Sequence, residues 1–137
     1  MLIHASCVRW QDKGILLMGS SGAGKSSAAL MLMEKGAVLI ADDYVQIKQK
    51  DGQLFAKCPD TIFQKLEVRG IGIVTLKNAI QQTPLDLVIA CTPDFAAVPR
   101  MPEHQAWKAF DTSLPLFRLC PFENTFPSKV GLAIAGL

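Results

Sequence analysis

The stretch GSSGAGKS at residues 19–26 constrains the fold more than any other feature of the chain, because it has the spacing G-x-x-x-x-G-K-S. It follows the apolar residues 14–18 and precedes residues 26–35, whose apolar positions recur at helical spacing. Its glycines let successive backbone N–H groups point inward, and the helix that follows adds the positive end of its dipole. The pattern therefore predicts a strand, an anion-binding loop and a helix, in that order.

The side chains of this loop indicate that the anion is a nucleoside triphosphate. Lys25 is expected to reach the β- and γ-phosphates, and the Ser26 hydroxyl to ligate Mg²⁺. A Gly/Ser loop with a lysine can also arise by chance, but the strand–loop–helix context argues against that alternative. The expected nucleotide-binding residues are Gly19, Ser20, Ser21, Gly22, Ala23, Gly24, Lys25, Ser26 and Ser27.

Strands and helices are expected to alternate around this loop, which predicts an α/β fold. Two hairpins are predicted, one from strands 3–10 and 14–18 with its turn closed by Gly14, and one from strands 45–48 and 54–57 across residues 50–52. The phosphate helix is expected at 26–35 with Gly36 as its C-cap, followed by a strand at 37–41 buried on both faces. Further predicted elements are a short helix within 59–66, strands at 85–90 and 114–119, a helix or strand at 130–137, and loops through most of residues 84–127, which hold seven of the eight prolines.

Two adjacent carboxylates, Asp42 and Asp43, end the predicted strand 37–41. In folds of this type the carboxyl end of that strand lies beside the bound phosphates, so one carboxylate can hold Mg²⁺ and the other can accept a proton. Since adjacent residues on a strand point to opposite sides, the two need not share a role. A solvated loop pair or a helix cap remains the alternative. His4 is either a structural residue or, if the first strand lies beside the strand 14–18 that leads into the loop, a neighbour of Asp42.

Composition excludes several function classes. A chain of 137 residues predicts one domain, residues 1–137. Its 14 basic and 12 acidic residues are scattered without a run of like charge, so neither a nucleic-acid partner nor a membrane surface is indicated. No apolar stretch is long enough for a membrane span, and the N-terminus lacks the pattern of a signal peptide. The widely spaced cysteines at 7, 58, 91 and 120 predict buried free thiols in a reducing cytoplasm.

Four landmarks in combination resemble the catalytic domain of the bacterial HPr kinase/phosphorylase family, the serine kinase of the phosphocarrier protein HPr. They are His4, fifteen residues before Gly19, then GSSGAGKS, then ADD at 41–43, then LEVRGIGI at 66–73. The resemblance implies a P-loop (Walker A) kinase domain related to phosphoenolpyruvate carboxykinase, with ATP and Mg²⁺ as cofactors. It also implies an HPr-like phosphocarrier protein as partner, a role in regulating sugar phosphotransferase and carbon metabolism, and homo-oligomers, commonly hexamers.

The same resemblance implies residue roles. Asp42 matches the family's catalytic aspartate, His4 the histidine that interacts with it, and Lys25 the phosphate-binding lysine. That aspartate acts as base when serine attacks ATP, and as acid when phosphate attacks phosphoserine. Ser26 and Asp43 are the expected metal residues. The segment LEVRGIGI at 66–73, the signature segment, is expected at the active site and the partner contact, through Glu67, Arg69, Gly70 and Gly72.

Three departures from the longer family members distinguish this chain. Its first catalytic strand begins almost at Met1, which resembles a short form without the N-terminal domain; Ser27 stands where glutamate is frequent; and residues 121–124 lack a basic Pro-Gly-Arg segment, for which Lys129 is a possible substitute. Kinase activity is therefore implied more strongly than phosphorylase activity. A non-catalytic ATP sensor and a small-molecule kinase stay open as alternatives, whereas the guanine-reading Asn-Lys-x-Asp of a GTPase is absent.

Overall fold

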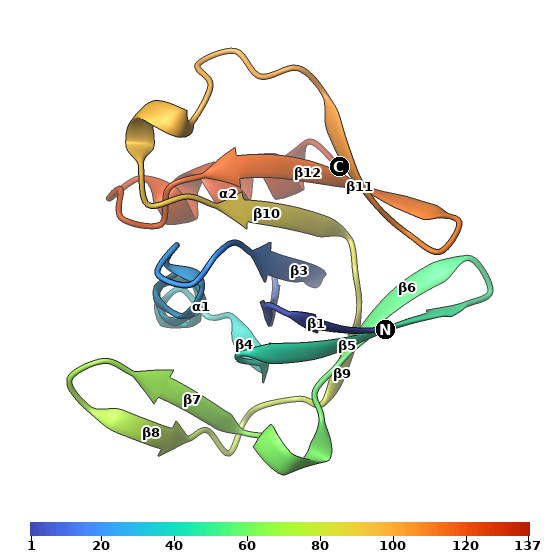
Figure 1. Cartoon of the computed structure of the whole chain (residues 1–137), viewed down its shortest axis with the longest axis vertical. Helices are drawn as coiled ribbons and strands as arrows, with labels where there is room; N and C mark the ends of the chain where they lie inside the picture. The colour runs from blue at the N-terminus through green and yellow to red at the C-terminus, as the bar shows by residue number, and fades with distance from the viewer.

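A mixed six-stranded sheet forms the middle layer of the molecule in a computed structural model that describes residues 1–137 (Figure 1). Its strand order is β11-β12-β10-β3-β2-β4, with β10 parallel to both β3 and β12 and the other pairs antiparallel. The strands are β11 (Gln105–Ala109), β12 (Thr112–Leu119), β10 (Leu87–Cys91), β3 (Lys13–Met18), β2 (Ser6–Trp10) and β4 (Val38–Ala41). The predicted α/β fold is confirmed.

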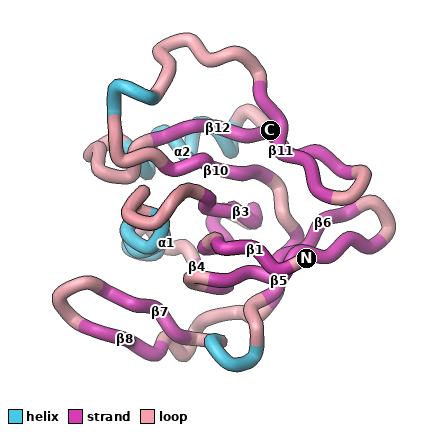
Figure 2. The backbone as a smooth tube through the Cα atoms, viewed as in Figure 1, coloured by secondary structure: helices cyan, strands magenta, loops and turns pink.

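Two helices cover one face of this sheet, and a four-stranded sheet covers the other (Figures 1 and 2). The helices are α1 (Lys25–Glu34) and α2 (Phe126–Ala135), and the second sheet has the order β1-β5-β6-β9, from β1 (Leu2–His4), β5 (Tyr44–Lys50), β6 (Gln53–Lys57) and β9 (Gln82–Pro84). Alternate residues of β3 divide between the two cores: Ile15 and Leu17 pack on the helix side, and Leu16 packs on the sheet side. A strand buried on both faces therefore leads directly into the phosphate loop.

Both predicted hairpins form. The β2–β3 turn consists of Gln11 and Asp12, with φ of 51° and 63°, and the β5–β6 turn of Asp51 and Gly52, with φ of 53° and 75°. Two consecutive residues at positive φ are typical of a tight hairpin turn whose twist matches that of the strands. Gly14 was predicted to close the first turn, but it lies within β3, opposite Arg9.

Helix α1 begins and ends one residue before the predicted bounds, and Gly36 turns the chain after it as expected. Gly36 has a φ of 105°, and its N–H donates to the Met33 carbonyl while the Ala37 N–H donates to the Leu32 carbonyl. These two bonds make a Schellman motif, which turns the chain from α1 into β4. Strand β4 is almost completely buried although it is the last strand in the sheet order.

The chain crosses from one sheet to the other between β1 and β2 and again between β4 and β5, and the two crossings lie side by side. In the six-stranded sheet β2 pairs with β4, with Cys7 opposite Ala41, and in the four-stranded sheet β1 pairs with β5, with His4 opposite Tyr44. Each pair is interrupted where the chain crosses, and the Ala5 N–H donates to the Asp43 carbonyl at 3.1 Å across the break. Residues 4–6 and 42–44 therefore form one shared bend.

Several predicted elements differ from the structure. The short helix expected within 59–66 is one 3₁₀ turn, Asp60–Ile62, followed by β7 (Lys65–Val68), which pairs with β8 (Gly72–Thr75). Residues 84–127 contain three strands, so they are less loop-rich than predicted. Pro115 lies inside β12, opposite Ala106 of β11, and the ladder with β10 begins at the next residue, Leu116. The terminal element left open as helix or strand is α2.

All four cysteines are buried and free, as predicted. Burial raises the pKa of the Cys91 thiol to about 12, although the nearby Lys25 charge lowers it, and burial together with Asp60 and Asp42 raises the pKa of Cys58 to about 11. These thiols stay protonated near neutral pH, which makes them poor nucleophiles. No helix has the length and apolar character needed to cross a membrane.

We expect position 14 to require glycine because the neighbouring backbone leaves no room for a side chain. A Cβ at this position would lie 1.8 Å from the Pro84 carbonyl oxygen, and the Gly14 N–H and carbonyl both bond to Asp86. Gly14→Ala should therefore lower the free energy of unfolding by about 3 kcal/mol, since the backbone must move apart. Urea unfolding measures this change through its midpoint.

Gly131→Ala in α2 is the matched control, because a Cβ there would lie 3.7 Å from the Trp10 ring, an ordinary contact. It should leave stability unchanged or raise it by about 0.5–1 kcal/mol, as alanine is the better helix former. Equal unfolding midpoints for Gly14→Ala and the parent protein would contradict the contact between Gly14 and Pro84.

Candidate functional site

The loop between β3 and α1 has the backbone shape of an anion-binding cradle. Gly19, Gly22 and Gly24 have φ of 150°, 83° and 97°, values that glycine adopts more easily than other residues. A Cβ on Gly19 would also lie 2.8 Å from the Cys91 carbonyl oxygen. Gly24 caps α1 without a side-chain hydrogen bond, so the first N–H groups of the helix stay free to bind an anion.

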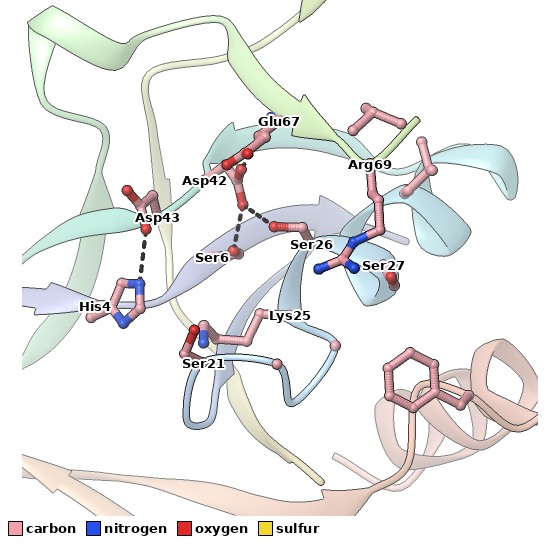
Figure 3. Close-up of a pocket in the computed structure, with 15 residues that line it drawn as sticks. His4, Ser6, Ser21, Lys25, Ser26, Ser27, Asp42, Asp43, Glu67 and Arg69 are labelled. Carbon is pink, nitrogen blue, oxygen red and sulfur yellow. Dashed lines mark hydrogen bonds and ion pairs between the residues drawn. The ribbon is translucent and has the colours of Figure 1, made fainter. Parts of the chain in front are cut away.

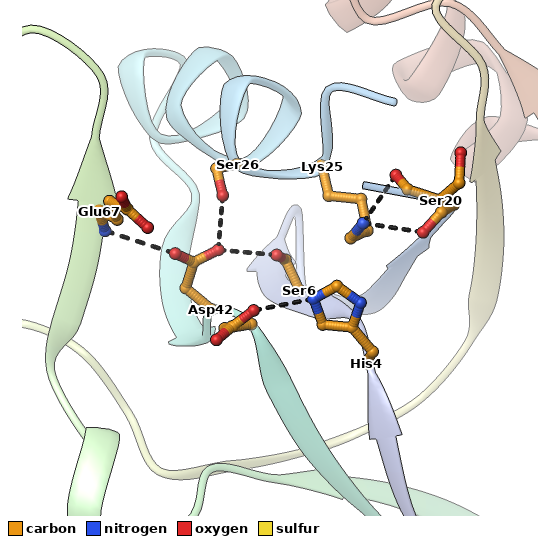
Figure 4. Close-up of polar contacts among 9 residues, drawn as sticks. His4, Ser6, Ser20, Lys25, Ser26, Asp42 and Glu67 are labelled. Carbon is orange, nitrogen blue, oxygen red and sulfur yellow. Dashed lines mark hydrogen bonds and ion pairs between the residues drawn. The ribbon is translucent and has the colours of Figure 1, made fainter. Parts of the chain in front are cut away.

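Lys25 holds its charge over the beginning of this loop. Its side chain is 8% exposed, and Nζ donates to the carbonyl oxygens of Gly19 at 2.8 Å and Ser20 at 3.1 Å (Figure 4). Because these are bonds to neutral acceptors, the positive charge remains available to phosphate oxygens. This arrangement fits the predicted role of Lys25.

Asp42 connects three elements of the site. Its Oδ1 accepts hydrogen bonds from the hydroxyls of Ser6 on β2 and Ser26 on α1, each at 2.8 Å, and its Oδ2 accepts from the Glu67 N–H at 3.4 Å (Figure 4). The residue is 7% exposed. A buried carboxylate is stabilised by such donors. Asp42 therefore faces the serine that is predicted to ligate Mg²⁺.

Asp43 turns away from Asp42 and pairs with His4. The Nε2–H of His4 donates to Asp43 Oδ1 at 2.8 Å, and both side chains are well exposed, at 47% for His4 and 63% for Asp43. The Tyr44 N–H donates to the Asp42 carbonyl, and with a φ of 79° at Asp43 this makes a γ-turn of the rare positive-φ type. The imidazole was predicted to lie near Asp42; the structure instead pairs it with the neighbouring carboxylate.

These groups line one pocket of about 640 Å³, within the usual size range of a small-molecule site (Figure 3). Eleven of its 15 lining residues were predicted as site residues: His4, Ser21, Gly22, Gly24, Lys25, Ser26, Ser27, Asp42, Asp43, Glu67 and Arg69. Of the other predicted residues, Gly19 and Ser20 support Lys25 through their carbonyls, and Ala23 is buried. The structure thus brings the separate sequence motifs together at one end of β3.

Residues 67–72 of the signature segment form the end of the β7–β8 hairpin. Glu67 belongs to β7, and the Ile71 N–H donates to the Val68 carbonyl to close the turn. Gly70 and Gly72, with φ of 91° and 109°, shape this turn but do not line the pocket. Arg69 does line it, and Figure 3 shows its side chain extending toward Ser27.

Four lining residues were missed by sequence reasoning: Ser6, Leu30, Val68 and Phe122. A signal for Ser6 existed, because it follows His4 by two residues, the spacing that places two strand residues on one face. Leu30 and Val68 were interpreted only as parts of their elements. Phe122 comes from the distant β12–α2 connection, and nothing local to its segment indicates that it reaches the phosphate loop.

Oxygen ligands suited to Mg²⁺ are present in the pocket. The Ser26 hydroxyl and the Asp42 carboxylate are already in hydrogen-bond contact, and Glu67 lines the same space. No group of three or more His, Cys, Asp or Glu side chains is placed to hold a metal ion. Mg²⁺ is typically held by one or two carboxylates together with substrate phosphates, so the residues present fit this ion when a nucleotide is bound.

Comparison with known proteins points to one family. The model of the HPr serine kinase C-terminal domain matches residues 1–90. The HPr kinase/phosphorylase of Brevibacillus brevis is 53% identical over 54% of this chain and 24% of its own length, and that of Lactiplantibacillus plantarum is 35% identical over 97% of this chain and 43% of its own length. The chain thus spans less than half the length of these curated relatives.

A solved structure supports the fold over the whole chain. The structure of the Hpr(Ser) kinase/phosphatase from Coxiella burnetii superposes with a TM-score of 0.83 and covers 99% of this chain and 95% of that one. Its sequence identity is 23%, so this likeness speaks for the fold. It extends the agreement to residues 91–137, beyond the segment that the family model matches.

We expect the two serines that share Asp42 to differ in their effect on nucleotide binding. Ser26→Ala should weaken Mg²⁺-ATP binding by about tenfold or more, because it removes a predicted metal ligand. Ser6→Ala removes a hydrogen bond of the same length to the same oxygen and serves as the matched control, with a smaller loss. Titration calorimetry with ATP at fixed Mg²⁺ measures both; equal losses would mean that Ser26 acts only by holding Asp42.

Proposed function

The chain belongs to the family of the HPr serine kinase C-terminal domain, and from that premise we propose that it is an ATP- and Mg²⁺-dependent kinase. Its acceptor is a serine hydroxyl of an HPr-like phosphocarrier protein in the cytoplasm. The observation that carries this proposal is the different placement of two adjacent carboxylates. Asp42 is buried against Ser26, whereas Asp43 is exposed in the pocket and paired with His4.

This geometry favours Asp43 as the general base. A serine hydroxyl is hardly ionised at neutral pH, so its attack on a phosphate requires a base within hydrogen-bond reach. Asp43 lies at the surface of the pocket, where an acceptor protein can present that hydroxyl. The hydrogen bond from His4 orients the carboxylate and leaves its second oxygen free. The resemblance implied the base at Asp42, and the metal was expected at Asp43; the two roles are therefore exchanged in this proposal.

The chemical step can be written through the chain's own residues. The acceptor Oγ–H gives its proton to Asp43 while Oγ forms a bond to the γ-phosphorus, and the bond from that phosphorus to the β,γ-bridging oxygen breaks to release ADP. Lys25 and the N–H groups at the start of α1 neutralise charge on the phosphate oxygens. Ser26 and Asp42 would hold Mg²⁺, which would supply further charge neutralisation on the phosphate chain when bound.

The proposal extends to phosphorolysis of the phosphorylated partner. An oxygen of inorganic phosphate forms a bond to the phosphorus of phosphoserine, the bond from that phosphorus to the serine Oγ breaks, and pyrophosphate is released. Asp43, now protonated, gives its proton to the leaving serine oxygen. Arg69 at the pocket wall is the candidate contact to the phosphate or to the partner. By the same family relation we propose a homo-oligomer and a regulatory role in carbon metabolism. An ATP sensor and a small-molecule kinase are the competing functions that the tests below separate.

We expect Asp43→Asn to separate binding from chemistry. Asparagine keeps the shape of the side chain but cannot take the proton, so phosphate transfer should fall by about 10²- to 10⁴-fold while ATP affinity is retained. His4→Ala should cost less, because it removes only the orienting bond. Asp51→Asn is the matched control, since Asp51 is an exposed aspartate that also has a positive φ. Unchanged transfer in Asp43→Asn would return the base to Asp42.

Incubation with γ-labelled ATP, Mg²⁺ and purified HPr tests the function as a whole. One phosphate should appear on a serine of HPr, located by mass spectrometry, and inorganic phosphate should remove it again. Phosphate on a small molecule would replace the acceptor in this proposal. Tight ATP binding with no transfer to HPr would favour the sensor.

A further inference from the structure

The pocket is polar except at three residues. Of the 15 side chains or backbones that line it, only Leu30, Val68 and Phe122 are hydrophobic. Phe122 is 58% exposed and Leu30 is 43% exposed. A phosphate site needs none of these groups, and an exposed aromatic ring in a ligand pocket is a common contact surface for a flat apolar group.

These three residues lie at the same end of the pocket. Leu30 follows Ser27 by three positions on α1, which places both on one helix face, and Val68 directly precedes Arg69. Figure 3 shows Ser27 and Arg69 on the opposite side of the pocket from His4 and Asp43. Phe122 adjoins the loop at this end, since its Cζ would lie 3.1 Å from a Cβ on Gly24.

The phosphate loop gives a bound nucleotide its direction. The Lys25 amine lies over Gly19 and Ser20, at the beginning of the loop, and the proposed base Asp43 is on the His4 side. The terminal phosphate therefore belongs at that end. The remaining phosphates follow the N-terminus of α1 toward Gly24 and Ser27, so the nucleoside leaves the loop on the side of Leu30, Val68 and Phe122.

We propose that Phe122, together with Leu30 and Val68, forms the subsite for the base of the bound nucleotide, with the Phe122 ring stacked against the base. This inference rests on the proposed function, because it requires a nucleoside triphosphate on the loop. Leu30 and Val68 supply apolar contact from the α1 and β7 sides. The subsite reads the flat face of the base, which stacking recognises without hydrogen bonds.

The connection that carries Phe122 is held in place before any ligand arrives. The Glu123 N–H donates to the Cys120 carbonyl, and the Glu123 carboxylate pairs with Lys129 at 3.0 Å. Pro121 on one side of Phe122 is buried and lies against Gly24, and Phe126, the first residue of α2, is completely buried in the core. A ring supported in this way loses little conformational freedom when the base stacks on it.

Binding of two ligands that share the phosphate chain tests the subsite. Phe122→Ala should weaken Mg²⁺-ATP binding by about 5- to 150-fold, the range measured when a stacking aromatic is removed. Binding of Mg²⁺-tripolyphosphate, which has no base, should stay at the parent's value. Phe122→Trp should restore ATP affinity because it keeps a flat ring. The control is Phe110→Ala, as Phe110 is 61% exposed but does not line the pocket.

Each other outcome overturns the inference. Parent-like ATP binding in Phe122→Ala would mean that the ring contacts no base. Equal weakening of ATP and tripolyphosphate would mean that the ring only supports Gly24 and the loop. If the parent protein bound tripolyphosphate and ATP equally well, the base would have no subsite, although the phosphate loop would still bind its ligand. If the parent protein bound neither ligand, both this inference and the proposed function would be wrong.

Discussion

The shared bend of residues 4–6 and 42–44 is the constraint on which the site depends. Two antiparallel strand pairs leave the six-stranded sheet for the four-stranded one at the same level, and the Ala5 N–H holds the Asp43 carbonyl at the crossing. Adjacent residues of an extended chain point to opposite sides, so the side chains of the two aspartates diverge at this crossing. As a result Asp42 is directed inward to the phosphate helix, and Asp43 outward to His4.

This bend gives the two adjacent carboxylates different surroundings. Asp42 joins β2, α1 and β7 through Ser6, Ser26 and Glu67, so this carboxylate is part of the packed structure. Asp43 is exposed and has a positive φ, a strained conformation that is frequent at functional sites. The buried carboxylate is suited to hold a fixed ligand, and the exposed one to meet a group carried by another protein.

Local sequence patterns predicted the parts of the fold that depend on neighbours in the chain. The phosphate loop and the helix closed by Gly36 follow from glycine spacing, and the two hairpins, predicted with turns at 11–13 and 50–52, follow from the strand patterns on either side of them. What sequence reasoning missed depends on distant residues: Gly14 is fixed by the Pro84 carbonyl, and Phe122 reaches Gly24 from the β12–α2 connection. The partner of His4 was predicted as Asp42 rather than Asp43, since the β1–β5 register that places His4 opposite Tyr44 joins distant segments of the chain.

The Mg²⁺ dependence of ATP affinity in Asp42→Asn and Asp43→Asn tests the separation of the two carboxylates most directly. The carbonyl oxygen of asparagine can still accept from Ser6 and Ser26 at position 42, or from His4 at position 43, although its amide cannot accept the 3.4 Å bond from the Glu67 N–H. It is a weaker ligand for a hard cation. The predicted result is that Asp42→Asn needs about ten times more Mg²⁺ for half-maximal enhancement of ATP binding, whereas Asp43→Asn needs the same Mg²⁺ as the parent. A raised Mg²⁺ requirement in Asp43→Asn alone would contradict the assignment of the metal to Asp42.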